Sequence, residues 1–549
     1  MEQDSEALCV HFGQIQSLSE SPTSAQPSDH ARPQTGQAAS QTRSAILGVP
    51  RTLAVVTGSQ LRSRFLDRAA ERLWAVEGRL DLPDVINFRD LRPFWKDYRS
   101  EVLEHLHNTQ YTPNHIELVE HPKDYISTRP LARLSVQDRL IYEALAFEVA
   151  ESIDPLLSDS VFNHRSRHRS VHSVADWKLM RKTARDFLSA DKNLLMAKTD
   201  IASFYEHVEI DVLSMDLAAF GVGEDVVTQL WGFLNGFERQ CHTWGLPQGS
   251  AASGILANAY LLPVDNLIQQ FDIRFIRYSD DMYLFDSNEE KLRSTLQRIN
   301  RAFRARHLNM SAPKTRILAR KDAEEHLDDM RKDLILYFLG LGKPWAVKDL
   351  QDLFLSAVNA TPPNERDIKF SLPTLGYRKD DFAFPWALDS IKSWHHLSAR
   401  ILRYLERLPD KRKDLQVTLE KILDQIPTVD YPFLERNIFE TAIRCGIRSD
   451  VLRAKAWLAV RDRNRSNYPR EFAARYIGRL GNSIDGQLLK MEYEGESHID
   501  VRRALLVAMH EADYMPPELL KNLEKGSTIL KWTAKYLLRA PDEVPIPKF

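Results

Sequence analysis

The sequence predicts an α+β region that is followed by an all-α region. Between about residues 110 and 342, short apolar runs rich in β-branched and aromatic residues alternate with helical patterns and Gly/Pro turns. After Gly342 glycines become few, and apolar residues recur at spacings of three and four, as in Leu397, Ile401, Leu405 and Leu408. With 549 residues the chain is long enough for two or three domains.

The chain before this folded part has a different composition. Residues 17–43 are rich in Ser, Gln, Ala, Thr and Pro and contain almost no large apolar side chains. Such a segment cannot bury enough apolar surface to offset the entropy of ordering, so residues 1–48 are predicted to be disordered. From about residue 49 to 110 the apolar spacing becomes helical, and the first domain is predicted to begin there.

The most informative stretch is Phe275–Phe285, in which Asp280 and Asp281 stand between two apolar, β-favouring runs. This pattern predicts a tight hairpin with both carboxylates at its tip. Like charges at this spacing repel and are costly to desolvate, so a cation is expected to neutralise them, and carboxylate oxygens suit Mg²⁺. A solvated turn is the alternative for an isolated pair of aspartates.

Two segments upstream point to the same chemistry. An apolar run, Leu194–Thr199, ends at Asp200 and is followed by the aromatic residues Phe204 and Tyr205. Between the two acidic sites, Gly245–Asn258 predicts a Gly/Pro loop that enters a helix of small residues. The predicted order is therefore a strand with an aspartate, a glycine loop with a helix, and a hairpin with two aspartates.

Together these segments resemble the palm motifs of reverse transcriptases, in the order in which that family has them. The matching residues, from first to fifth motif, are Asp200 with Phe204 and Tyr205; Gly245–Gly249 with Ser253 and Asn258; Tyr278–Asp281; Leu308 and Asn309 with Lys314 and Thr315; and Phe338–Gly340. The fingers segments of bacterial and group II intron enzymes resemble Arg129–Leu131 with Asp138 and Arg139, and Phe162–Arg165. The resemblance spans roughly residues 110–342. It implies the fingers and palm of a right-hand polymerase, with residues 49–342 as that domain.

The resemblance implies nucleotidyl transfer assisted by two divalent ions, which clamp the attacking and leaving oxygens. Asp200 and Asp280 are predicted to ligate Mg²⁺, or Mn²⁺ in its place, and Asp281 is a further ligand or an orienting group. By analogy with the family, the backbone carbonyl of Ile201 completes the metal shell. Lys314 is the fourth predicted catalytic residue, which protonates or neutralises the leaving pyrophosphate; a solvated surface lysine is the alternative.

Contacts with the incoming nucleotide follow from the same resemblance. Tyr205 would hold its ring against the 2′ position of the sugar and exclude ribonucleotides, unless it only packs in the palm. Gln248 and Gly249 would lie along the dNTP, where glycine lets the backbone approach closely. A plain turn is a second role for Gly245 and Gly249, and it does not exclude the first.

Two arginines are predicted to bind phosphates. Arg129 would grip the triphosphate, because a guanidinium forks onto phosphate oxygens. Arg165 lies in the basic run 164–172 and is predicted to contact the template. A hydrated loop is the alternative for this basic run.

Composition limits the surroundings of this chemistry. The formal net charge is −2, so nucleic acid must bind in a local channel and not through an overall basic surface. Cys9, Cys241 and Cys445 have no metal-ligand spacing and argue against disulfides, which fits a reducing bacterial cytoplasm. No run of about 18 apolar residues exists, so no membrane span is expected, and the acidic N-terminus is unlike a signal peptide.

The C-terminal part, residues 343–549, carries an internal repeat. Segments 472–477, 501–506 and 530–535 begin 29 positions apart (501 − 472 and 530 − 501), and each carries small alanines. This spacing predicts stacked helix pairs of the HEAT-like kind in place of a thumb, with an ordinary helical bundle as the alternative.

A palm followed by helical repeats, without RNase H or endonuclease signatures, resembles the bacterial abortive-infection and defence-associated reverse transcriptases. The resemblance implies an RNA-directed DNA polymerase that uses dNTPs and an RNA template in anti-phage defence, commonly as a homo-oligomer. Some members make DNA without a supplied template, primed from their own side chain. Template-independent synthesis and nascent DNA covalently attached to the protein therefore stay open. The alternative from another class is a catalytically inactive polymerase-fold scaffold that binds nucleic acid or phage protein through its helical repeats.

Overall fold

The structure is a computed structural model, and it describes residues 63–75, 82–108, 111–166, 173–327, 330–426, 431–539 and 544–546. All of these residues belong to one compact unit. The segment predicted to be disordered, residues 1–48, lies outside them. None of the helices in the described ranges combines the length and the apolar character that crossing a bilayer requires.

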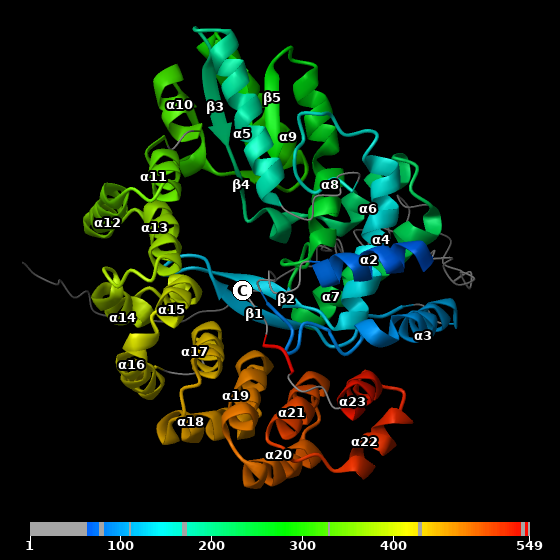
Figure 1. Ribbon diagram of the computed structural model, residues 1–549. Coiled ribbons are helices and arrows are strands. Elements are labelled where there is room, and N and C mark those ends of the chain that lie inside the picture. Colours follow the sequence, from blue (N-terminus) through cyan, green and yellow to red (C-terminus); the bar gives the residue numbers. More distant parts are fainter. Residues whose placement is uncertain are drawn as a thin grey trace, which may run out of the picture. The chain divides into compact units, whose positions relative to one another are not determined.

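The first half of the described chain mixes helices with short strands, as its alternating patterns predicted (Figure 1). The elements that precede the predicted palm are α2 (Ser63–Ala75), η1 (Arg92–Phe94), α3 (Trp95–Asn108), β1 (Glu117–Pro122), β2 (Thr128–Arg133), α4 (Val136–Ile153) and α5 (Ser173–Ala190). The elements of the predicted palm are β3 (Leu195–Thr199), β4 (Ile201–Ala202), η2 (Phe204–His207), α6 (Ile210–Ala219), α7 (Glu224–Cys241), α8 (Ala251–Gln269), β5 (Arg274–Tyr278), β6 (Asp281–Asp286), α9 (Glu289–Ala305), β7 (Asn309–Met310), η3 (Ala312–Lys314) and β8 (Arg316–Leu318).

A four-stranded antiparallel sheet in the order β5-β6-β3-β8 forms the centre of this half. Two small pairings, β1 with β2 and β4 with β7, lie outside it. Helix α8 is buried along most of its length and packs against α4, because small and apolar residues occupy nearly all of its positions. The sheet and α8 therefore give the predicted palm a rigid core.

The second half of the described chain is helical throughout. Its elements are α10 (Arg320–Leu327), α11 (Met330–Gly340), α12 (Pro344–Asn359), α13 (Glu365–Tyr377), α14 (Phe384–Ser393), η4 (His395–Leu397), α15 (Ser398–Glu406), η5 (Pro409–Lys411), α16 (Arg412–Gln425), α17 (Pro432–Cys445), α18 (Asp450–Arg461), α19 (Asn467–Leu480), α20 (Ser483–Gly495), α21 (Ile499–Glu511), α22 (Pro517–Glu524) and α23 (Leu530–Leu538). Alternate helices from α13 to α23 contact one another in chain order. The three segments spaced by 29 positions lie in α19, α21 and α23. The all-helical prediction is confirmed, and the HEAT-like class of the repeat stays a prediction.

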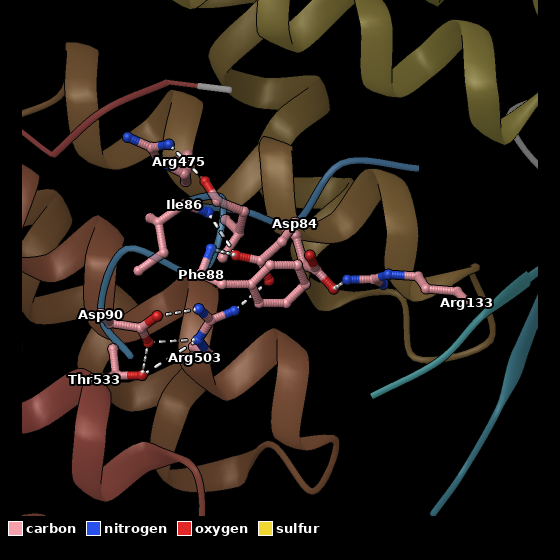
Figure 2. Close-up of polar contacts among 10 residues, drawn as sticks. Asp84, Ile86, Phe88, Asp90, Arg133, Arg475, Arg503 and Thr533 are labelled. Carbon is pink, nitrogen blue, oxygen red and sulfur yellow. Dashed lines mark hydrogen bonds and ion pairs between the residues drawn. The ribbon is translucent and has the colours of Figure 1, made fainter. Parts of the chain in front are cut away.

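The two halves pack against each other through the segment that lies between α2 and η1 in the chain. Its residues Val85 and Ile86 pack in the core of the helical half, whereas Trp532 of α23 packs in the core of the first half. Figure 2 shows the guanidinium of Arg503 (α21) between the carboxylates of Asp84 and Asp90, to both of which it donates hydrogen bonds. Each half thus supplies residues to the core of the other. A division into separate domains at residue 342 stays a prediction.

Candidate active site

The hairpin predicted around Asp280 and Asp281 is formed by β5 and β6. Tyr278 and Asp281 are its last paired residues, and Ser279 has a φ of 58°, in the left-handed region that tight turns use. Strand β6 also pairs with β3 in a register that sets Met282 opposite Thr199. Because Asp281 precedes Met282 and Asp200 follows Thr199 in this antiparallel pair, the register brings Asp200 alongside the hairpin tip. The convergence of the three carboxylates is thus a consequence of strand pairing.

Burial and mutual repulsion shape the charges at this point. Asp200 is only 4% exposed. Burial, followed by the charge of Asp200, raises the pKa of Asp280 to about 6, and the same two causes raise the pKa of Asp281. The ammonium of Lys314 lies 2.8 Å from Asp200 Oδ2. Burial lowers the pKa of Lys314, but the hydrogen bond to Asp200 and the charges of all three aspartates raise it overall. Three carboxylates and the ammonium of Lys314 therefore form a single electrostatic cluster, and the charge of Lys198 also acts on Asp281.

The chemistry of this cluster suits a divalent cation, although the described residues contain no ready-made group of three or more acidic, histidine or cysteine side chains in a metal-binding arrangement. The donors are carboxylate oxygens, which Mg²⁺ and Mn²⁺ prefer. Three carboxylates against the ammonium groups of Lys314 and Lys198 leave an excess of negative charge when all are ionised. Asp200, Asp280 and Asp281 thus remain the predicted metal ligands. Ile201 follows Asp200 directly, with its side chain buried and β4 paired to β7, and its carbonyl remains a predicted ligand.

The predicted sugar gate lies next to the aspartate turn. The hydroxyl of Tyr205 is 3.4 Å from Ser279 Oγ. Burial raises the pKa of Tyr205, the hydrogen bond to Ser279 opposes this, and the charges of Asp280 and Arg129 act on it in opposite directions. Arg129 itself is an exposed residue of β2. Tyr205 thus lies beside the aspartate turn, and the charge of Arg129, from a separate element, acts on its hydroxyl.

The glycine loop is tied to the same aromatic segment. Leu246 N–H donates to the carbonyl of Tyr205 at 2.8 Å, and Gln248 Nε2 donates to Glu206 Oε1 at 3.0 Å. Gly245 has a φ of 83°, and a Cβ on it would lie 2.1 Å from the carbonyl oxygen of Tyr205. The close approach of the Tyr205 carbonyl therefore requires glycine at position 245. Gly249, with a φ of 94°, has room, because a Cβ there would meet only Leu131, at 3.8 Å.

Gly245→Ala is expected to lower the free energy of unfolding by about 2–4 kcal/mol, the sum of left-handed strain and a backbone overlap that cannot relax without breaking the loop. Gly249→Ala is the matched control, since it meets the same strain without the overlap and should cost about 1–2 kcal/mol. Chemical denaturation of both variants measures the difference. Equal losses in the two variants would contradict the packing given for Gly245.

Arg165 does not face a template in this structure. Its guanidinium is buried and donates to the backbone carbonyls of Asp154, Leu157, Ser158 and Val161. These bonds hold the turn after α4, and a buried guanidinium committed to carbonyls cannot also reach a phosphate backbone. The role predicted for Arg165 is therefore replaced by a structural one. Residues 167–172 of the basic run lie outside the described residues.

Arg277 is a supporting residue that sequence reasoning missed. It is fully buried in β5 and makes a bidentate pair with Asp265 of α8, at 2.9 and 2.6 Å. It also donates to Asn258 Oδ1 at 2.8 Å and to the carbonyl of Ser279 at 2.9 Å. The second bond holds the left-handed residue of the aspartate turn. An arginine within an otherwise apolar strand run was the signal available in the sequence.

Comparison with known proteins identifies part of the chain. Residues 121–343 match the family described as "Reverse transcriptase (RNA-dependent DNA polymerase)". No curated protein matches. Solved structures with partial similarity include apo telomerase from Candida tropicalis truncated from its C-terminal domain, at 15% identity over 41% of this chain and 55% of that chain, with a TM-score of 0.27.

Two further telomerase structures have similar values. Telomerase from Candida tropicalis in complex with a TWJ fragment of telomeric RNA is 13% identical over 67% of this chain and 68% of that chain, with a TM-score of 0.28. Telomerase from Candida albicans in complex with such a fragment is 14% identical over 63% and 69%, also with a TM-score of 0.28. Scores of this size do not establish a common overall architecture.

Proposed function

We propose that this protein, which contains a reverse transcriptase domain over residues 121–343, is an RNA-directed DNA polymerase that adds dNMPs in a Mg²⁺-dependent reaction. The observation that carries the proposal is the convergence of Asp200, Asp280 and Asp281 with Lys314. Asp200 lies in the loop after β3, and Asp280 and Asp281 lie at the tip of the hairpin paired to it. Burial of charges that repel one another is costly for folding, so their retention favours a chemical role.

Each residue has a defined task in this proposal. Asp200, Asp280 and Asp281 would hold the metal pair, which when bound supplies charge stabilisation to the attacking and leaving oxygens. Lys314 lies within reach of the same carboxylates and would place its ammonium near the leaving pyrophosphate. On the nucleotide side, Arg129 would bind the triphosphate through its exposed guanidinium. Arg165 has no task in this scheme.

The test is dNTP incorporation by the full-length protein, with an RNA template and a DNA primer, in Mg²⁺, in Mn²⁺ and in EDTA. Incorporation that requires both the metal and the template is the expected result. Product made equally well without RNA would favour template-independent synthesis, and mass spectrometry of the protein would then show whether DNA is attached to it. Nucleic-acid binding without incorporation in either metal would favour the inactive scaffold and refute the polymerase.

The biological setting belongs to the same proposal. The consecutive contacts among the helices from α13 to α23 support the proposed resemblance to bacterial abortive-infection enzymes. That resemblance implies a cytoplasmic protein that acts in anti-phage defence as a homo-oligomer. Phage plating on cells with the wild-type gene and with a variant of the aspartate cluster would test the defence role. Light scattering of the purified protein would test the oligomer. Equal plating on both strains would refute the catalytic route to defence.

Tyr205→Ala is expected to raise the use of ribonucleotides relative to deoxynucleotides by about ten- to a hundredfold, because loss of one steric clash changes discrimination by a few kcal/mol. The physical reason is the place of the ring beside Ser279 and the aspartates. Single-nucleotide incorporation with matched rNTP and dNTP measures the ratio. Tyr205→Phe is the control, since it keeps the ring and should keep the discrimination. An unchanged ratio in Tyr205→Ala would assign the tyrosine a packing role only.

A further inference from the structure

The β1–β2 hairpin of the first half is fixed to the helical half by buried polar contacts. Glu117 of β1 accepts hydrogen bonds from the hydroxyl of Ser466, at 2.6 Å, and from the N–H of Asn467, at 2.8 Å. These are the residues at which α19 begins. A carboxylate at a helix N-terminus satisfies unpaired N–H groups and is favoured by the helix dipole. The hairpin thus caps a helix of the other half.

A carboxylate of the helical half also contacts the hairpin. Its partner is Arg133, the last residue of β2. The guanidinium of Arg133 lies 2.5 Å from Glu471 Oε1 and 3.1 Å from Glu117 Oε2. Glu471 is 1% exposed, and Arg133 is 11% exposed at its side chain. Without Glu471 the guanidinium of Arg133 would keep its contact with Glu117 of the same hairpin but would lose its ion pair with α19.

Apolar packing accompanies these ion pairs. Val119 of β1 forms a separate small core with Phe433 of α17 and Tyr468 of α19. The ring of His121 also packs on Phe433, with centroids 4.5 Å apart. The hairpin therefore packs against two neighbouring helices of the helical half, α17 and α19.

The same strand β2 borders the predicted nucleotide site. Ala132 N–H donates to the carbonyl of Gln248 at 3.0 Å, and Leu131 forms an isolated bridge with Gln248. Arg129 lies four residues before Arg133 on this strand. Both predicted nucleotide contacts, Arg129 and Gln248, therefore take their positions from a strand whose end is clamped by Glu471.

We propose that the helical half acts as a brace for the nucleotide site, with Glu471 as a positioning residue that acts through Arg133 and β2. The inference rests on the proposed function for the meaning of the site. It gives the helical half a role in dNTP binding that does not need contact with nucleic acid. The carboxylate cluster is held separately, by β3, β5, β6 and Arg277, so the brace governs nucleotide affinity and not the chemical step.

The test compares Glu471→Ala with Glu496→Ala in the full-length protein. Glu496 is the matched control, since it is the buried partner of another arginine of α19, Arg470, and within the described ranges it forms no ion pair with a residue of β2. Glu471→Gln serves as a milder variant if Glu471→Ala does not fold, because it keeps an oxygen acceptor for Arg133. Two quantities are measured: backbone hydrogen exchange over residues 128–133 and 245–249, and KM and kcat for dNTP.

Glu471→Ala is expected to speed hydrogen exchange in both segments by about tenfold or more, since the local opening energy falls. The KM for dNTP is expected to rise by about three- to thirtyfold with little change in kcat, the usual range for residues that couple to a site without touching the ligand. Glu496→Ala should leave exchange and KM as in the wild type, even where it lowers the melting temperature equally.

If the two variants speed hydrogen exchange equally, general destabilisation explains the result, and the proposal that Glu471 positions β2 is refuted. Unchanged exchange and KM in Glu471→Ala would overturn it as well. A fall in kcat at constant KM would assign Glu471 to the carboxylate cluster and contradict the proposal. If the wild-type protein incorporates no dNTP, the proposed function fails, and the exchange comparison still decides whether Glu471 holds β2 and the glycine loop.

Discussion

Asp280→Asn is expected to reduce dNTP incorporation by about a thousandfold or more, because the loss of a metal-ligating charge removes several kcal/mol of transition-state stabilisation. The stability of the folded state should not decrease in this variant. Burial and the neighbouring Asp200 already raise the pKa of Asp280 to about 6, so the charge is unfavourable for folding. An amide of the same shape removes that repulsion. The melting temperature should therefore stay constant or rise while activity disappears.

The control for this result is Asp286→Asn at the far end of the same strand β6. Asp286 pairs with Lys291 at 2.9 Å, away from the cluster, and its loss should leave incorporation nearly unchanged. Single-turnover incorporation and thermal unfolding are measured for both variants. If Asp280→Asn keeps more than about a tenth of wild-type incorporation, the metal-ligand assignment is refuted, because one lost ligand costs far more than that.

Arg503→Met is expected to lower the free energy of unfolding by about 3–5 kcal/mol, since removal of one partner leaves buried carboxylates without compensation. Arg503 is 2% exposed, and it donates to Asp84 and Asp90, of which Asp90 is fully buried (Figure 2). Thr533 of α23 joins the same network by donating to Asp90. One substitution therefore loosens the connection between the two halves. Urea denaturation measures the loss.

Arg502→Met is the matched control, one position earlier on α21. Arg502 donates to the hydroxyl of Tyr493 at 2.9 Å and is only partly buried, so its loss should cost no more than about 1 kcal/mol. A similar cost in the two variants would contradict the role given to the Arg503 network.

The pH dependence of stability offers a second check on Arg503. Burial raises the pKa of Asp84, but the charge and hydrogen bonds of Arg503 lower it overall below its ordinary value. A lowered folded-state pKa gives a contribution that is present above the ordinary aspartate pKa of about 4 and is lost as the pH falls. In Arg503→Met only the backbone N–H groups of Ile86 and Phe88 still oppose the effect of burial on Asp84, so this contribution should become smaller and stability should fall less between pH 7 and pH 4 than in the wild type. Denaturation of both proteins at pH 4 and pH 7 tests this difference.

The sequence by itself determined the parts of this protein that depend on local patterns. The hairpin of Asp280 and Asp281, the strand before Asp200 and the helices from α12 onward were predicted, because turn chemistry and apolar periodicity act within a few residues. The order of the motifs further predicted a resemblance to reverse transcriptases over roughly residues 110–342, and residues 121–343 match that family. The positions of helices α19, α21 and α23 followed from a repeat of 29 residues.

Only the tertiary structure decided which charged residues support the site and which touch the chain itself. Arg165 matches a sequence motif, yet its guanidinium donates to backbone carbonyls nearby. Gly245 also matches a motif, and the carbonyl of Tyr205 occupies the space that a Cβ there would need. Glu117 meets Ser466 from 349 positions away, and Asp84 meets Arg503 from 419 positions away. The physical reason is that a buried ion pair needs two opposite charges and a packed surrounding, and neither leaves a periodic trace in the sequence. Which charges are buried together is fixed only when distant helices and strands close around them.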